Sequence, residues 1–461
     1  MFRVSRVPWA TLAVLWALSG CVSPSSPYAE SAEPRPLGAE LPTYEAPPHP
    51  AREQPPTLES TEGPRDTVDL AQALAAALLR NPELAAFSWE VRSREARALQ
   101  AGLLPNPEAG VELENFGGTG ATSSFDSTES TLLLSQRIET AGKRSKRREA
   151  ATRDADVAAW EYEMARLQVF ASVQHAFYEV LAAQERLALS EELVRVTETS
   201  RSAVERLVSR GATPRAELTR AAVEASAARV DVSSARRALE AARAQLAATW
   251  GGLAPDFTRV EGEIGEISAP PDPSAARTWL ARNPELQRWD REVARHESLV
   301  ALEDARRFPD VTAGAGVRRL EESDDTALVA QLSVPIPVFD RNQGARAAAR
   351  SDLRKAEYER RAAHARLSAA LESTQQQLSA RFEEVASLRG EILPAANEAF
   401  EQVRQGYGRG LFRNVDVLDA QRRLFELRLR EIEALRAYRA AATDLERLTG
   451  TPLSGSAPGL P

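Results

Sequence analysis

The sequence predicts a mainly α-helical protein with a small β part, built from two tandem copies of one unit. The pentapeptide Arg80-Asn81-Pro82-Glu83-Leu84 recurs as Arg282-Asn283-Pro284-Glu285-Leu286, and internal similarity of this kind indicates a duplicated fold. No Gly or Pro occurs between Lys143 and Arg210, so this stretch can form one helix of roughly 100 Å at 1.5 Å per residue. Short segments of alternating polarity precede each long helical stretch and predict the β part.

The amino end has the pattern of a bacterial export signal. Arg3 and Arg6 precede an apolar run over 7–18, which has the length of a signal-peptide core and is too short to span a bilayer. The run ends in Leu-Ser-Gly before Cys21, which resembles the lipobox of bacterial lipoproteins, so we expect a signal peptide over 1–20 and a lipid on Cys21. The alternative is ordinary secretion with a free thiol.

A proline-rich segment follows the only cysteine. Eleven prolines occur between positions 22 and 66, and helical periodicity is almost absent there. A segment of this composition favours an extended or disordered chain. We therefore expect residues 21–66 to be a tether between the lipid and the folded part.

The first copy is expected to occupy residues 67–250. Apolar residues at three- and four-residue spacings predict its helices, and period-two alternation predicts its strands. In order, we expect a helix over 67–103, strands over 107–116 and 130–138, a long helix over 141–209 and a returning helix over 214–250. A connector over 251–272, which contains Gly-Gly and Pro-Pro pairs, should separate the copies.

The second copy repeats the same order over residues 273–450, and a short tail follows over 451–461. Gly390 and Pro394 should bend its long helix, because proline removes a backbone donor and crowds the preceding turn. In order, we expect a helix over 273–306, strands over 308–318 and 326–336, a long helix over 342–405 and a returning helix over 414–449.

The four strands each have one apolar face and one smaller or more polar face. In the first strand, Ala109, Val111 and Leu113 share one side, whereas Glu108 and Glu112 lie on the other. Strands of about ten residues with this alternation fit a transmembrane β-barrel, but even the smallest outer-membrane barrels need about eight strands. Either the strands form a soluble sheet, or several chains pool them, with eight strands for a dimer and twelve for a trimer.

The composition excludes several classes of function. The net charge of -8 gives no electrostatic support for binding nucleic acid. One Cys, four His and two Met are too few for a zinc or copper cage within one chain, so we expect no resident metal or cofactor. We find no nucleophile-base arrangement or phosphate-binding loop and predict that the protein is not an enzyme.

Duplicated units of helix, strand pair and two helices behind a lipobox resemble the TolC family of outer-membrane efflux channels. The resemblance covers roughly residues 67–450. Two stretches resemble its cobalt-zinc-cadmium (CzcC-type) branch, namely Glu139-Thr140-Ala141-Gly142-Lys143-Arg144 and Ser333-Val334-Pro335-Ile336-Pro337-Val338-Phe339-Asp340-Arg341-Asn342-Gln343-Gly344. The resemblance implies a homotrimer with a twelve-stranded β-barrel, to which each chain gives four strands, and an α-barrel across the periplasm.

The resemblance also implies a function and partners. The chain would be the outer-membrane duct of a tripartite efflux system, with a periplasmic adaptor protein and an inner-membrane RND pump that supplies the energy. The CzcC-type likeness favours heavy-metal cations as cargo, and export of drugs or organic compounds stays open. From another class, the chain could be a periplasmic coiled-coil scaffold that is tethered by Cys21 and has a soluble sheet.

The turns that follow the long helices carry the candidate contact residues for the adaptor. The resemblance implies that these tips face the adaptor. The implied contact positions are Arg210, Gly211, Thr213, Glu217 and Gly410. The alternative is plain helix capping, in which the glycines end one helix and Thr213 or Asn414 caps the next.

A candidate periplasmic gate lies just beyond the second tip. Val415-Asp416-Val417-Leu418-Asp419-Ala420 matches the family segment whose aspartates line the closed entrance, and Tyr407 matches another gate position. Three chains would bring six carboxylates to one narrow mouth and attract cations. The alternative is that Asp416 and Asp419 are solvated surface acids and that Tyr407 is a buried tip aromatic.

Overall fold

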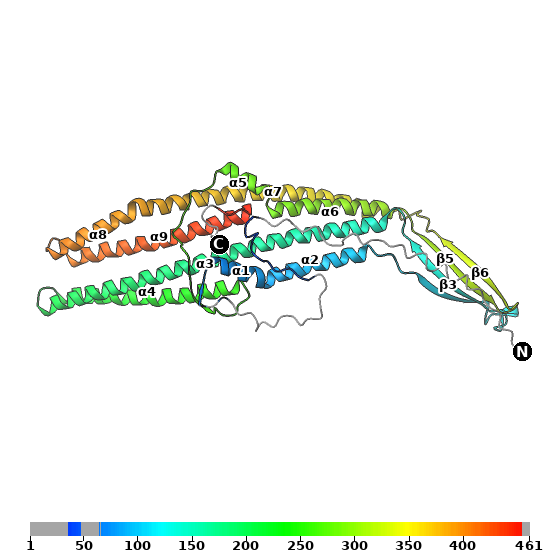
Figure 1. The fold of residues 1–461 in the computed structure, drawn as a ribbon, viewed down its shortest axis with the longest axis horizontal. Helices are drawn as coiled ribbons and strands as arrows, with labels where there is room; N and C mark the ends of the chain where they lie inside the picture. Colours follow the sequence, from blue (N-terminus) through cyan, green and yellow to red (C-terminus); the bar gives the residue numbers. More distant parts are fainter. Residues whose placement is uncertain (1–35, 48–63, 65, 454–461) are drawn as a thin grey trace.

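The structure is a computed structural model, and it describes residues 36–47, 64 and 66–453. The expected signal peptide, Cys21, much of the segment 21–66 and most of the tail over 451–461 lie outside the described residues. The molecule is elongated, with a small sheet at one end of its long axis and two helical hairpin tips at the other (Figure 1).

Helix α3, over Lys143–Ser209, is the central element of the fold. Its 67 residues correspond to roughly 100 Å of helix. Helices α2 and α6 pack on the half of α3 near the sheet, and α4 and α9 pack on the half near the tips (Figure 1). A helix of this length depends on such neighbours, because most helical stability in proteins comes from packing of an apolar face.

The single helix expected over 67–103 is wrong. Strand β1 (Asp66–Val68) is followed by two helices, α1 (Leu70–Arg80) and α2 (Pro82–Ala101). Asn81 separates them in an extended conformation, at φ -60° and ψ 122°, because the ring of the following proline disfavours the helical region. The second copy has the same break at Asn283, between α5 (Pro273–Leu280) and α6 (Pro284–Arg306).

The four expected strands form one antiparallel sheet in the order β2-β3-β5-β6. The first copy supplies the two strands on one side and the second copy supplies the other two. A short 3-10 helix over Gly120–Thr122 lies in the loop of the first strand pair. The strand bounds are Glu108–Glu114 for β2, Glu129–Ile138 for β3, Val311–Leu320 for β5 and Asp325–Ser333 for β6.

The register of the sheet aligns apolar side chains in rows across both copies. Val111 pairs with Leu132, Leu132 with Val317, and Val317 with Leu328. All four side chains are exposed in the single chain, from 43% for Val317 to 89% for Leu328. The outer edges of β2 and β6 have no partner strand within the described residues. One face of this sheet is therefore apolar and uncovered.

The second long helix is interrupted where Gly390 and Pro394 predicted a bend. Helix α7 (Gln343–Ser387) passes into a five-residue π-helical turn over Leu388–Ile392, and α8 (Leu393–Gly408) continues from it. A π-turn accommodates a helix position at which the regular bonding pattern is lost, as it is at proline. The returning helices are α4 (Arg215–Ala248) and α9 (Asn414–Thr449).

The connector crosses the helices near the middle of the molecule, where it is drawn in dark green in Figure 1. It contains a strand that the sequence did not predict, β4 (Phe257–Val260), which pairs in parallel with β1. Two neighbouring side chains of the returning helix over Asn414–Thr449 bind the rest of the connector. The Tyr438 hydroxyl donates to the Ser268 carbonyl oxygen at 2.7 Å, and Arg439 donates to the carbonyl oxygen of Glu263 at 3.0 Å.

Residues 36–47, which belong to the expected tether, pack against the same middle region. Leu37 is 3% exposed, and its backbone N–H donates to the Gly450 carbonyl oxygen at 3.2 Å. The buried Arg166 guanidinium donates to the Leu37 carbonyl oxygen at 3.1 Å and forms an ion pair with Glu163. This segment, called the strap below, therefore joins the first copy to the end of the second.

Candidate functional site

The two hairpin tips have the same turn geometry. Gly211 and Gly410 adopt positive φ angles of 71° and 78°, a region that glycine reaches without steric cost. In the first tip the Ala212 N–H donates to the Leu207 carbonyl oxygen at 2.9 Å. In the second, the Leu411 N–H donates to the Gly406 carbonyl oxygen at the same distance. The duplication therefore extends to the backbone of the tips.

The capping roles expected for Thr213 and Asn414 are wrong. Pro214 occupies the N-cap of α4 and makes no side-chain capping bond, and Asn414 is already the first residue of α9. The start of α9 is instead stabilised by Asp416, whose Oδ2 accepts from the Arg413 N–H at 2.7 Å. Because Pro214 has no N–H and a fixed φ, it starts its helix without help from a neighbouring hydroxyl.

The tips carry more positive charge than their acids neutralise. Glu217 pairs with Arg220 at 3.1 Å, and Asp416 lies 3.8 Å from the Arg413 guanidinium. In contrast, Arg210 and Arg409 are exposed and have no ion partner among the described residues. Thr213 is half-buried. The tips therefore present basic side chains around two repeated glycine turns.

The three candidate gate residues differ in their surroundings. Asp416 caps its own helix, whereas Asp419 is exposed and has no hydrogen bond or ion pair among the described residues. Tyr407 is half-buried near the end of α8. Asp416 therefore has a structural role in the single chain, as the cap of its helix. No such role is visible for Asp419 among the described residues.

Ion pairs hold α9 against two of its neighbouring helices. On α3, His175 Nε2 lies 3.3 Å from Asp444 Oδ1, and this hydrogen bond holds the pKa of Asp444 below its usual value. On α7, hydrogen bonds from Arg430 and Arg381 lower the pKa of Glu384. These carboxylates stay ionised at neutral pH and act as cross-links between helices.

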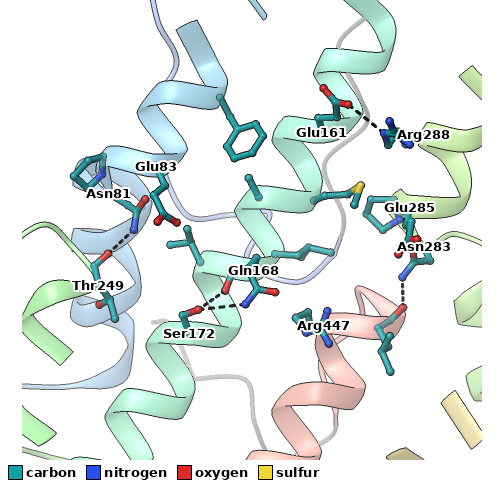
Figure 2. Close-up of a pocket in the computed structure, with 18 of the residues that line it drawn as sticks. Asn81, Glu83, Glu161, Gln168, Ser172, Thr249, Asn283, Glu285, Arg288 and Arg447 are labelled. Atoms are coloured by element: carbon teal, nitrogen blue, oxygen red, sulfur yellow. Dashed lines mark hydrogen bonds and ion pairs between the residues drawn. The ribbon is translucent and has the colours of Figure 1, made fainter. Parts of the chain in front are cut away.

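The repeated pentapeptide forms a junction in each copy, a role that was not predicted from the sequence. The Asn81 amide donates to the Thr249 carbonyl oxygen at the end of α4, at 2.8 Å. The Asn283 amide donates to the Leu448 carbonyl oxygen near the end of α9, at 2.7 Å (Figure 2). Each Asn also accepts a backbone N–H from its own helix start. The motif thus connects the end of one helix to the start of another.

Replacing Asn283 by alanine is expected to lower the free energy of unfolding by about 2–4 kcal/mol. The change removes a helix cap and leaves the buried Leu448 carbonyl oxygen without its donor. Denaturant melting of the detergent-solubilised protein measures the effect. Asn283→Asp retains the capping oxygen and should lose less, and Asn81→Ala should lose less because Asn81 is only partly buried. Equal stability of all variants would contradict the junction role.

Among the described residues, no cluster of three or more His, Cys, Asp or Glu side chains could hold a metal ion. Within the same part of the chain, no helix has the length and apolar composition needed to cross a bilayer.

A cavity of about 910 Å³ lies between the two junctions, over the middle of α3. Its wall includes Asn81 and Asn283 from the two pentapeptides and Gln168 from α3 (Figure 2). Most of the connector and the strap lie on the other side of α3, because Phe170 and Phe177 contact Gly38 and Gly262 there, and only Gly251 at the start of the connector borders the cavity.

Comparison with known proteins identifies the same duplication. The family model described as outer membrane efflux protein matches residues 73–252 and again residues 276–451. The cobalt-zinc-cadmium resistance protein CzcC of Cupriavidus metallidurans is 32% identical over 384 residues, which cover 83% of this chain and 90% of that protein. The nickel-cobalt-cadmium resistance protein NccC of Alcaligenes xylosoxydans is 27% identical over 62% of this chain and 64% of that protein.

Solved structures share the fold at lower identity. A membrane protein from Pseudomonas aeruginosa superposes with a TM-score of 0.74 at 18% identity, over 89% of this chain and 97% of that one. The CusC channel superposes with a TM-score of 0.69 at 17% identity, over 89% of this chain and 99% of that one. The resemblance to TolC-type channels is thereby confirmed, and the chain belongs to the outer membrane efflux protein family.

Proposed function

We propose that the chain is the outer-membrane channel component of a tripartite efflux system and forms a homotrimeric, passive duct. The observation that carries this proposal is the four-stranded sheet, which has an exposed apolar row and two edges that no strand of the described residues pairs with. Open sheet edges are not stable in lipid, and four strands are too few to close. Three chains would supply twelve strands, which is within the range of outer-membrane barrels.

The other face of the sheet suits a water-filled interior that passes cations. Glu108, Glu112 and Glu114 lie on this face of β2. Arg318 neutralises part of the charge, with Glu129 at 2.7 Å and Glu114 at 3.1 Å from its guanidinium. Three copies of this face would leave carboxylates along the interior, and a lining of one sign raises the local concentration of the opposite ion.

The tips are the proposed docking site for a periplasmic adaptor protein, which in turn contacts an inner-membrane RND pump. Arg210, Gly211, Thr213, Glu217 and Gly410 are the proposed contact positions. Their support is the shared turn geometry and the exposed arginines that lack an ion partner within the described residues. Acidic or carbonyl-rich helix ends on the adaptor would complement this surface.

The proposed periplasmic gate comprises Asp416, Asp419 and Tyr407, and the proposed anchor is a lipid on Cys21. The carboxylate of Asp419 supports the gate, because an exposed acid with no partner in the described part of the chain can face the channel axis. A lipid on Cys21 would add a second attachment of each chain to the outer membrane, with the helices in the periplasm. The pump would supply the energy for transport.

The proposed cargo is a set of divalent heavy-metal cations. The similar proteins are named for resistance to cobalt, zinc and cadmium, to nickel, cobalt and cadmium, and to nickel and cobalt. Deletion in the host should lower tolerance to these metals, measured as growth against a metal series beside a panel of drugs and solvents. Unchanged metal tolerance with reduced drug tolerance would favour export of organic compounds instead.

A lipid-tethered scaffold with a soluble sheet is the other class to be tested. A channel should run as a heat-sensitive trimer after detergent extraction, should fractionate with the outer membrane and should conduct ions in a planar bilayer. A monomer that stays in the aqueous fraction would overturn the channel. This experiment does not depend on the identity of the cargo.

A further inference from the structure

The cavity at the middle of α3 has the size and lining of a small-molecule site. Its volume of about 910 Å³ lies within the range of pockets that hold drug-sized ligands. The lining residues come from the helices of both copies and from the end of α9. The cavity is also separate from the tips, the gate and the sheet.

Apolar side chains form much of the wall. Phe87 of α2 is 41% exposed and borders the cavity. Met164 of α3 and Leu367 of α7 line other parts of the wall. Aromatic rings and thioethers attract flat, polarisable ligands, and an aromatic face also attracts a cation.

The cavity has one uncompensated charge, and that charge is negative. Five charged residues line it, and four of them have a partner of opposite sign. The pairs are Glu161 with Arg288 at 3.2 Å, Glu285 with Arg366 at 2.9 Å, and Arg447 with Asp444 at 3.9 Å. The fifth, Glu83, has no hydrogen bond or ion partner among the described residues, and Figure 2 shows its carboxylate directed toward α3.

The Glu83 side chain is exposed and lies at the start of a helix. Glu83 lies in the first turn of α2, which Pro82 begins and Asn81 caps. A negative charge at a helix start interacts favourably with the helix dipole. On the facing wall, Gln168 of α3 supplies a neutral amide. The cavity therefore combines a carboxylate at a helix start with a wall that contains both apolar side chains and a neutral amide.

We propose that this cavity binds an amphipathic organic cation, with the positive group at Glu83 and the apolar body against Phe87 and Met164. A bare divalent metal ion does not fit the site, because Glu83 is a single free carboxylate and a metal needs several ligands. The site goes beyond the proposed passage of metal ions and does not rest on it. An organic cation bound here would occupy the side of α3 opposite the strap.

The test is equilibrium binding of rhodamine 6G to the purified full-length protein in detergent, followed by fluorescence anisotropy. Saturable binding is expected, and Glu83→Gln should weaken it about fivefold, the value for losing one partly exposed ion pair. Ser172→Phe, which places a ring into the cavity, should abolish it. Glu83→Gln removes only the charge, so folding of this variant is expected to be unchanged.

A matched control separates this site from general attraction to an acidic protein. Glu149→Gln makes the same change in net charge at an exposed acid of α3, 12 residues before Glu161 and thus about 18 Å along the helix. It should leave the affinity unchanged. Equal effects of the two variants, or equal binding of anionic fluorescein, would overturn the proposal. This readout is binding of the dye and not ion conduction, so failure of the channel proposal remains distinguishable.

Discussion

Replacing Gly316 by alanine is expected to disrupt the sheet and to abolish the stable trimer. A Cβ atom at this position would lie 2.3 Å from the Leu132 carbonyl oxygen and 3.0 Å from the Leu133 Cα, both in the backbone of β3. Backbone atoms cannot rotate away as a side chain can, so β5 must move away from β3. We expect a loss of about 2–3 kcal/mol per chain, near the upper range for overpacking.

Gly110 provides the matched control, because both glycines pair with Leu133 and so share one row of the sheet. A Cβ atom at Gly110 meets nothing within 4 Å. Gly110→Ala should therefore leave the amount of heat-sensitive trimer and its melting temperature unchanged. Gly316→Ala should lower both the amount of trimer and the melting temperature. Equal behaviour of the two variants would show that the close approach of β3 and β5 does not limit assembly.

The sequence could predict those parts of the fold that have a local signal. Helix α3 follows from the absence of Gly and Pro, and the strands follow from alternation of side chains such as Val111 and Glu112. The duplication was visible as the repeated pentapeptide. These features need only neighbouring residues or internal comparison, and the structure has them close to the expected positions.

The middle of the molecule could not be predicted, because its contacts join residues far apart in the sequence. The strap has a composition typical of a free tether, yet Arg166 and Gly450 bind its backbone. Strand β4 has only four residues, and its partner β1 lies far away in the sequence, before the helices of the first copy. Such short segments have no periodicity from which their packing against the helices could be predicted.

The candidate site likewise contains features that could be predicted from local sequence and features that depend on tertiary structure. The tip glycines could be predicted, since a left-handed residue is the usual end of a helix and glycine is the usual choice. The pentapeptide was recognised only as a repeat, although Asn before Pro is a helix-start signal. Its second bond, to the end of a distant helix, depends on tertiary structure. The free carboxylate of Glu83 likewise became visible only when its neighbours were known.

Removing the charges of Asp416 and Asp419 is expected to weaken block of the channel by multivalent cations at least tenfold and to raise its conductance. In a trimer, six carboxylates would surround the entrance, and each unit charge several ångströms from an ion contributes about 1 kcal/mol or more at intermediate dielectric. Single-channel recording in planar bilayers, with cadmium or a trivalent cation added on the periplasmic side, measures both effects.

The choice of substitution decides what this experiment reports. Asp416→Ala would also remove the acceptor of the Arg413 N–H and cost about 1 kcal/mol of helix stability, so a wider pore could reflect a frayed tip. Asp416→Asn with Asp419→Asn keeps an acceptor at Asp416 and removes both charges. Glu321→Gln with Glu322→Gln removes the same charge from the hairpin at the opposite end of the molecule. If that control relieves the block equally, the tip aspartates do not form the gate. The overall acidic charge of the chain would then be what attracts the blocking cations.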